Sequence, residues 1–226
     1  MKLRLFYGIT LILLLSAPVS AIDYRVERLE EAPPSGELSA EIAQRLDPQG
    51  IRVICGTKTT YCDIWFCKDV AVTADFQSSS EMLYPFHPGQ IVGVARYARK
   101  GSDFRDQDIA KGIYTMRFAL QPTDGAHEGT SITRDFLLLL RAEDDPSAAD
   151  LDDVEALNDL SMEAAESSHP AMLALQPVPA GTSSLPTMRH DDGSDWWIVG
   201  TAAQAQTGDK SKNLRIDFVV VGAADE

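Results

Sequence analysis

Cysteines, basic residues and long apolar stretches are all scarce in this sequence. Its 226 residues include three cysteines and 20 lysines and arginines, against 34 aspartates and glutamates, and the net charge is −14. So acidic a surface repels phosphate backbones and anionic lipid, and we therefore expect no nucleic-acid partner and no partner at a membrane surface. The sequence also lacks a G-x-S-x-G elbow and a glycine-rich phosphate loop, which leaves serine chemistry and phosphate binding of that kind without support.

The one long apolar stretch lies at the start of the chain. Residues 5–15 are mostly apolar, Lys2 and Arg4 precede them, and small residues ending at Ala21 follow. This order predicts a cleaved signal peptide over residues 1–21, because the stretch is too short and wrongly flanked for a membrane span. Loss of the two basic residues takes the net charge from −14 to −16. We expect an exported protein, periplasmic or extracellular, with no membrane span.

Residues 22–36 are predicted to form an N-terminal arm and linker, and residues 37–226 a single domain. Asp23 to Leu29 is either a short strand or an ordered arm, and the proline- and glycine-containing stretch "APPSG" follows it. The rest of the chain is long enough to bury one sizeable core. No internal repeat divides it.

Two segments have the periodicity of helices. In residues 37–46 the apolar positions recur every four residues, and Asp47-Pro48-Gln49-Gly50 ends the pattern. In residues 147–166 four apolar side chains lie about one turn apart: Leu151, Val154, Leu157 and Leu160. Acidic residues crowd the start of this second segment, where they suit the positive end of the helix dipole.

Strand patterns dominate the remainder. In Ile113 to Leu120 apolar and polar residues alternate, which is typical of an antiparallel strand with one solvated face. Phe136 to Leu140 is apolar at every position, which predicts a central strand covered on both sides. Asp192-Gly193 marks a hairpin turn. Because no βαβ rhythm repeats, we predict a mainly β fold, a single antiparallel β-sandwich with two peripheral helices.

Two of the three cysteines flank a predicted turn. If Thr57 to Thr60, as the segment "TKTT", closes a hairpin, Cys55 and Cys62 face each other and a disulfide between them is within reach. Cys67 then falls on the opposite face of the second strand. We expect it to be a free, buried thiol.

Several motifs resemble those of a group of uncharacterised secreted bacterial proteins. The likeness rests on "SDFRDQDIAKGIYTMRFALQPTDGAHEGTSITRDFLLLL", on "SSHPAML" and on a closing strand "FVVVG". A tryptophan-containing strand, "CDIWFCKD", and the segment "LYPFHPGQIVG" precede them. The resemblance covers about Leu38 to Gly222 and implies a secreted β-rich domain. It implies no activity.

The polar connection between the strands at 113–120 and 136–140 is the first candidate site. Arg117 and Asp135 are expected to form a charge pair that pins the root of this connection. His127 could be a metal ligand or general base oriented by Asp124 or Asp135. No second histidine lies at a spacing typical of metal ligands, so we give the structural interpretation more weight.

The segment "SDFRDQD" is the second candidate. Arg105 could take an anionic partner, and Asp106 and its neighbouring aspartates could bind Ca²⁺, although their spacing matches no EF-hand. The simpler interpretation is an ion-paired surface loop. His169 precedes a proline and is either a turn residue or a binding residue.

The adjacent tryptophans Trp196 and Trp197 must face opposite ways on a strand. We expect one in the core, and the other either covered or offering a stacking surface for a sugar or peptide, which Trp65 could extend. Since no catalytic set is recognisable, we predict a non-catalytic binding module for a protein or glycan partner, with no cofactor. The alternative is a metal-dependent or acid/base hydrolase centred on His127 and Asp124, for which Ca²⁺ or Zn²⁺ stays open.

Overall fold

The chain folds mainly into β-strands, as the sequence predicts. The computed structural model describes residues 23–122, 133–181 and 184–222. The strands are β1 (Tyr24–Leu29), β2 (Gly50–Cys55), β3 (Thr59–Phe66), β4 (Val70–Ala71), β5 (Ile91–Tyr97), β6 (Gly101–Ser102), β7 (Asp108–Ile109), β8 (Gly112–Leu120), β9 (Asp135–Arg141), β10 (Met172–Gln176), β11 (Thr187–Asp191), β12 (Trp196–Thr207) and β13 (Lys210–Val221). The helices are α1 (Ala40–Arg45) and α2 (Val154–Ala165).

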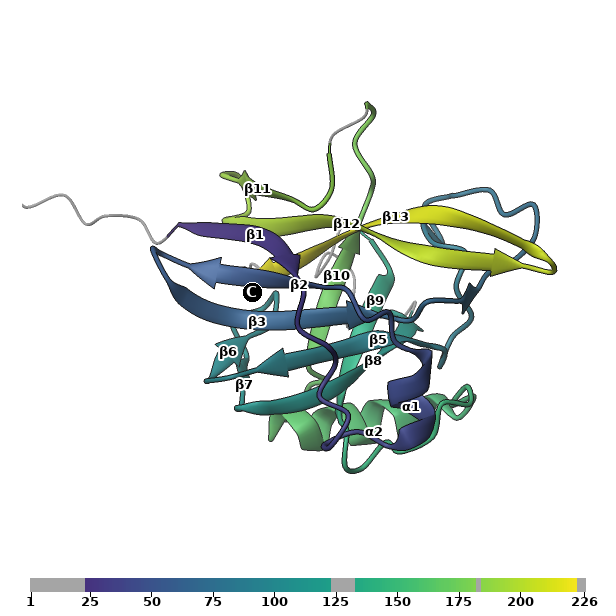
Figure 1. Cartoon of the computed structure of the whole chain (residues 1–226), viewed down its shortest axis with the longest axis horizontal. Coiled ribbons are helices and arrows are strands. Elements are labelled where there is room, and N and C mark those ends of the chain that lie inside the picture. The colour runs from purple at the N-terminus through teal and green to yellow at the C-terminus, as the bar shows by residue number, and fades with distance from the viewer. Residues whose placement is uncertain (1–22, 123–132, 182–183, 223–226) are drawn as a thin grey trace, which may run out of the picture.

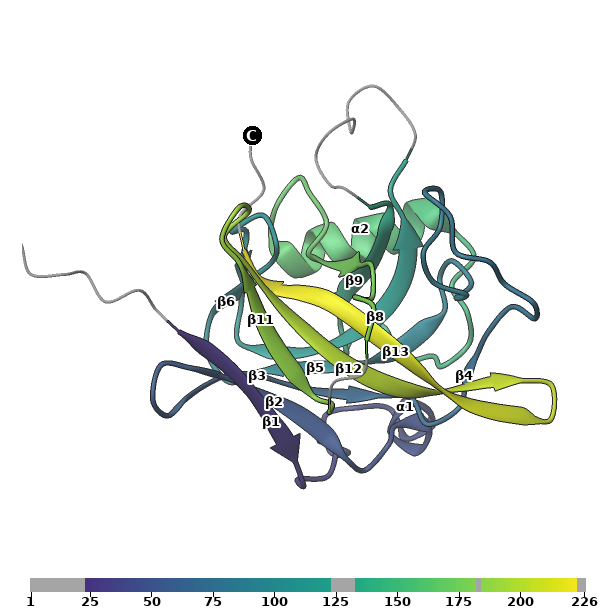
Figure 2. The ribbon, with the colours of Figure 1, turned by 90° about the horizontal axis from the view of Figure 1, so that it is seen from above.

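One large sheet contains most of these strands. Its order is β1-β2-β3-β5-β8-β9-β10-β13-β12-β11, with antiparallel neighbours throughout, and β4 adds a short parallel pairing to β12. The sheet curls until its two edge strands, β1 and β11, lie side by side (Figures 1 and 2). Because the hydrogen-bonded path is continuous, the predicted sandwich of two separate sheets is not confirmed.

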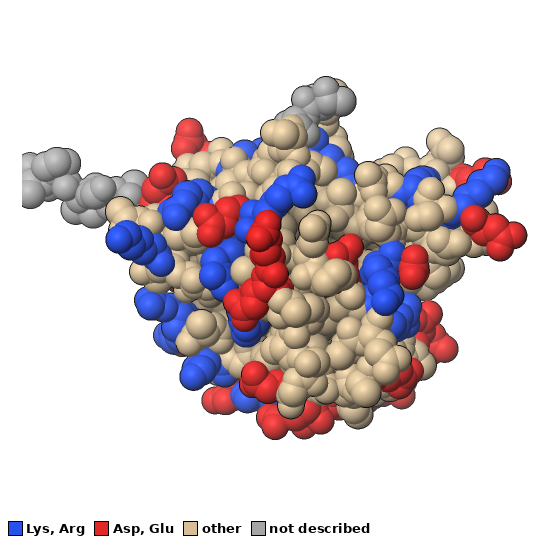
Figure 3. All heavy atoms as spheres, in the orientation of Figure 1, with Lys and Arg blue, Asp and Glu red and all other residues tan. Residues whose placement is uncertain are grey.

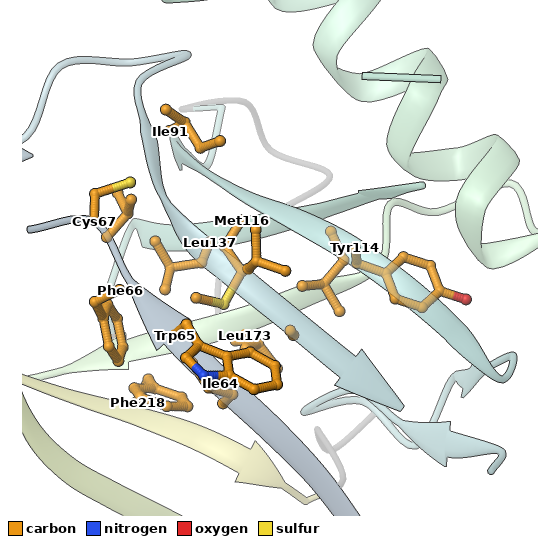
Figure 4. Packing of buried hydrophobic residues seen from close by; sticks show 14 of the residues in the cluster. Ile64, Trp65, Phe66, Cys67, Ile91, Tyr114, Met116, Leu137, Leu173 and Phe218 are labelled. Carbon is orange, nitrogen blue, oxygen red and sulfur yellow. The ribbon is translucent and has the colours of Figure 1, made fainter. Parts of the chain in front are cut away.

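The concave interior of the curled sheet holds the larger core. Ile64, Met116, Leu137 and Phe218 are fully buried and converge there from four strands (Figure 4). The inward side chains of β8 follow the predicted alternation. The opposite face of β8 is buried as well, whereas the sequence pattern predicts a solvated face.

A second core lies between the sheet and α2. Leu138 of β9 and Leu157 of α2 belong to it, together with Phe104 and Trp196. Leu137 and Leu139 of the same strand face the interior core instead. The prediction that the apolar strand 136–140 is covered on both sides is therefore confirmed.

Both helices are shorter than predicted. The Ser39 side chain accepts from the Ile42 N–H and begins α1, and the Asp153 side chain accepts from the Ala156 N–H and begins α2. Residues 147–153 are not helical. Val154, predicted on the apolar stripe, is 57% exposed.

The predicted N-terminal arm belongs to the sheet. β1 pairs antiparallel with β2 over its whole length. The following residues cross the outer face of β3, where the Glu31 carbonyl accepts a 2.9 Å hydrogen bond from the Trp65 indole N–H. Trp65 is fully buried and the Arg96 guanidinium lies 5.0 Å from its ring centre. It therefore offers no open stacking surface.

The predicted opposition of Cys55 and Cys62 is wrong. A register shift between Val53 and Ile54 places Cys62 opposite Val53 and Cys55 opposite Thr59. All three cysteines are free in the structure. Cys67 is buried as predicted, and burial raises the pKa of its thiol to about 11.

Charged side chains of both signs cover the face shown in Figure 3, and acidic groups gather along its lower edge, where Figure 1 places α2. Much of the basic charge is paired. Neither of the two described helices is long and apolar enough to cross a membrane.

Candidate functional site

A cavity of about 260 Å³ opens between α2, the sheet face that α2 covers, and the loop between β6 and β7. Its apolar wall is formed by Phe104, Ala119, Phe136, Leu138, Met162 and Met172. Its polar rim is formed by Arg105, Gln121, Asn158, Ser168 and His169. We call this cavity the α2 pocket. Among the described residues that line it, none is an aspartate or glutamate.

The loop between β6 and β7 is organised by Asp103. Its Oδ1 accepts the backbone N–H groups of Arg105 at 2.8 Å and of Gln107 at 3.0 Å. The Gln107 amide donates to the carbonyl oxygens of His169 at 3.1 Å and Pro170 at 3.2 Å. These bonds hold the loop against the segment between α2 and β10 and so fix two sides of the pocket.

Asp103 is fully buried. Burial raises the pKa of its carboxyl to about 6, although the backbone N–H groups of Arg105, Gln107 and Met172 favour the charged form. The carboxylate is thus already bonded by the loop that it shapes. Its role in the described structure is to position the neighbouring side chains.

Phe104 turns inward from the same loop and forms part of the pocket wall. Its ring centre lies 5.4 Å from that of Phe136 and 6.3 Å from that of Trp196. The first pair is tilted and the second edge-on, and aromatic pairs that avoid a face-to-face sandwich are favourable at such separations. Phe104 therefore anchors the loop to the sheet, while Arg105, the next residue, stays at the rim.

Two of the predicted binding residues, Arg105 and His169, meet at this rim. Arg105 is half-buried and His169 is exposed. Asp106 lies outside the pocket lining. Asp106 is exposed, its backbone φ is 60°, and its N–H donates a 3.1 Å hydrogen bond to the Gly222 carbonyl. Asp106 therefore shapes the turn.

Arg117 does not pair with Asp135, contrary to prediction. It is 1% exposed, and its Nε and Nη2 bind both carboxylate oxygens of Asp145 at 2.7 and 2.8 Å. Its remaining N–H groups reach the carbonyls of Gly89, Ser147 and Ala149. A guanidinium has five N–H donors, and all five are used, so none is left for a ligand.

The Arg117 contacts also explain the late start of α2. The guanidinium draws the Ser147 and Ala149 carbonyls toward the sheet, and Arg45 binds the Ala148 carbonyl at 2.6 Å. Carbonyls that point at arginine cannot accept helical hydrogen bonds. The segment before Asp153 is therefore not helical.

Asp135 is buried and anchors a different loop. Its carboxylate accepts the backbone N–H groups of Leu83 at 2.9 and 3.0 Å and of Tyr84 at 3.0 Å. Burial raises the pKa of this carboxyl. In the register of β8 and β9, Asp135 lies opposite Leu120, whereas Arg117 lies opposite Leu138.

Trp197 is covered, which is one of the two alternatives that its sequence position predicts. The His190 ring stacks on it at 4.4 Å with an interplanar angle of 21°, and Tyr24 lies 5.3 Å away. Trp196 faces the α2 core, as expected for its neighbour. Both tryptophans thus pack within the fold.

His190 is itself held between two carboxylates. Its Nε2 lies 2.8 Å from Asp195 and its Nδ1 lies 2.9 Å from Asp192. The hydrogen bond that the imidazole donates to the Asp195 carboxylate and the charge of Asp192 raise the pKa of the imidazole. The ring therefore closes the β11–β12 turn over Trp197.

A second cavity, of about 300 Å³, lies at the seam where the curled sheet nearly closes. Residues of β1, β2 and β12 line it, among them Arg28 and Ala202, and so does Cys67, the residue after β3. Arg28 donates to the Leu185 carbonyl at 3.2 Å across the seam. Its cation is thus partnered, whereas the Arg105 guanidinium makes no hydrogen bond or ion pair with the residues that the structure describes.

The predicted catalytic candidates His127 and Asp124 lie outside the described residues. Within residues 23–122, 133–181 and 184–222, no group of three or more histidine, cysteine, aspartate or glutamate side chains is arranged to hold a metal ion. No family model, curated protein or solved structure matches the chain. The predicted resemblance to secreted bacterial proteins thus stays a prediction.

Sequence reasoning missed most of the pocket. Phe104, Asn158 and Met172 come from three distant segments, and no local pattern joins them. One signal was available: Phe104 is a large apolar residue in the otherwise polar stretch "SDFRDQD". Such a residue in a loop needs a buried contact, and here that contact is the pocket wall.

Proposed function

We propose that the protein is an exported, non-catalytic binding protein and that the α2 pocket is its ligand site. The observation that carries the proposal is the pocket itself, an apolar wall with a few polar groups at the rim. Binding sites for small ligands generally have this composition. Burial of the apolar part of a ligand supplies affinity, and the rim supplies orientation.

The geometry favours an apolar ligand group over a glycan. Glycan binding commonly needs an open aromatic face, and the three tryptophans, Trp65, Trp196 and Trp197, are each packed against other side chains. The α2 pocket instead offers phenylalanine, leucine and methionine surfaces. Methionine side chains adapt readily to different apolar shapes.

The proposal can be tested by NMR titration of the ¹⁵N-labelled protein with a panel of small apolar, amphiphilic and sugar ligands. We expect shifts concentrated at Phe104, Ala119 and Asn158. The variant Ala119→Leu places extra volume in the pocket and should abolish them. Ala202→Leu is the matched control, because it makes the same change in the seam cavity.

The proposal fails if no ligand of the panel shifts these resonances. It also fails if binding survives Ala119→Leu and is lost in Ala202→Leu, which would place the site at the seam. The hydrolase alternative rests on His127 and Asp124, and no described contact favours it.

A further inference from the structure

Arg105 stands apart from nearly all other arginines of the described structure. Ten arginines donate to a carboxylate or a backbone carbonyl: Arg25, Arg28, Arg45, Arg52, Arg96, Arg117, Arg134, Arg141, Arg189 and Arg215. Within the described part of the chain, the Arg105 guanidinium makes no hydrogen bond or ion pair. Arg99 shares this property, but it is exposed in a loop and lines no cavity.

The acids nearest to Arg105 in sequence do not neutralise it through direct contact. The charge of Arg105 acts to lower the pKa of Asp103, but the Asp103 carboxylate is buried and accepts hydrogen bonds from backbone N–H groups of the loop. Asp106 is exposed on the turn that follows. In a protein with 34 acidic residues, Arg105 is half-buried without an ion pair, and none of the described residues that line the pocket beside it is acidic. Its guanidinium is therefore available to an anion.

The size of the pocket limits the ligand. A volume of about 260 Å³ equals roughly nine water molecules at about 30 Å³ each. It also lies near the lower end of the range for small-molecule sites, about 300–1,000 Å³. An apolar group of about eight carbon atoms fits such a space, with a polar head left at the rim.

These observations lead to a ligand class. We propose that the α2 pocket binds a small free monocarboxylate, with its apolar tail against Phe104, Phe136 and Leu138 and its carboxylate on Arg105. The inference rests on the proposed function, since it names the ligand of the same pocket. Arginine suits this role because its planar N–H groups match the two oxygens of a carboxylate.

Octanoate, octan-1-ol and octylammonium are suitable probes, because they share one tail and differ in the charge of the head. Titrations of the purified protein at constant pH and ionic strength should give the tightest binding for octanoate. Octan-1-ol should bind at least about tenfold more weakly, as expected for loss of a charge-assisted contact. Octylammonium should bind more weakly still.

Arg105→Gln should reduce octanoate affinity to that of octan-1-ol and leave octan-1-ol binding unchanged. Arg99→Gln is the matched control and should change neither affinity. Since the Arg105 side chain makes no hydrogen bond or ion pair with the described residues, and its charge is a minor influence on Asp103, the variant should melt close to the temperature of the unmodified protein. A melting experiment verifies that it is folded.

The outcomes separate the two proposals. If all three probes bind equally well and Arg105→Gln has no effect, the carboxylate inference fails and the apolar site stands. If no probe binds at the pocket, both fail. If a peptide ending in leucine binds more tightly than octanoate and depends on Arg105, the ligand is a protein C-terminus and the inference of a small free ligand is overturned.

Discussion

Replacement of Arg117 by methionine should strongly destabilise the fold. Methionine retains much of the side-chain length but leaves the Asp145 carboxylate, 5% exposed, with the Thr115 hydroxyl as its remaining side-chain donor. Three backbone carbonyls also lose their arginine donor. Removing one partner of a buried ion pair costs about 3–5 kcal/mol, a large part of the roughly 5–15 kcal/mol stability of a typical domain.

Urea unfolding followed by circular dichroism measures this change. Arg141→Met is the matched control, because Arg141 also pairs with a carboxylate, Glu166, at 2.8 Å, but the two side chains are 29% and 76% exposed. Exposed pairs contribute about 0–1 kcal/mol. We therefore expect the control variant to unfold close to the unmodified protein.

The double variant Arg117→Met/Asp145→Leu identifies the cause of the loss. Because it removes the unpaired charge, it should be more stable than Arg117→Met by at least about 1 kcal/mol. The single variant Asp145→Leu completes the comparison. If Arg117→Met costs no more than the Arg141 control, or if the losses of Arg117→Met and Asp145→Leu simply add in the double variant, then Arg117 does not compensate a buried charge and our account of it is wrong.

Three further predictions concern titratable groups. The pKa of Asp103 is raised from 3.8 to about 6, so ionisation opposes folding and stability falls as the pH rises through this interval. In urea unfolding at pH 7, Asp103→Asn should therefore be more stable than the unmodified protein by up to about 3 kcal/mol. Below pH 4 the variant should show no gain in stability. The pKa of His190 is raised by its aspartate partners, so the stabilisation from its charge is complete below about pH 6.5 and is lost as the pH rises through the higher folded-state value. His190→Gln should lower the melting temperature at pH 6 and have a smaller effect at pH 9, where the neutral ring still stacks on Trp197. An unchanged melting temperature at pH 6 would refute the clamp over Trp197. Burial raises the pKa of Cys67 and protects its thiol, whereas Cys55 is partly exposed. Ellman's reagent at pH 8 should label Cys55 in the folded protein and all three cysteines in urea. Two unreactive cysteines in urea would indicate a disulfide.

The strands could be predicted wherever one residue pattern determines burial. The unbroken apolar run of β9 identifies a strand covered on both faces, since no polar residue marks a solvated side. The alternation of β8 likewise identifies its inward side chains. These inferences need only neighbouring residues, which the sequence supplies directly.

Long-range partners could not be predicted in the same way. The alternation of β8 predicts that Arg117 is solvated. In the structure it is buried against Asp145, which lies 28 positions further along the chain. The disulfide prediction failed for a related reason, because a register shift of one strand against the other moves Cys62 away from Cys55. The α2 pocket depends on several distant segments, so composition alone points only to Phe104.

The near-closure of the sheet has a consequence for how the molecule behaves among its own copies. Exposed sheet edges present unpaired N–H and C=O groups that can recruit strands of other chains and begin aggregation. Here the two ends of the strand order, β1 and β11, lie against each other, and Tyr24, Trp197 and the Arg28–Leu185 bond close the line between them. Each edge therefore shields the other from the strands of other chains, although no ladder of hydrogen bonds joins the described strands β1 and β11.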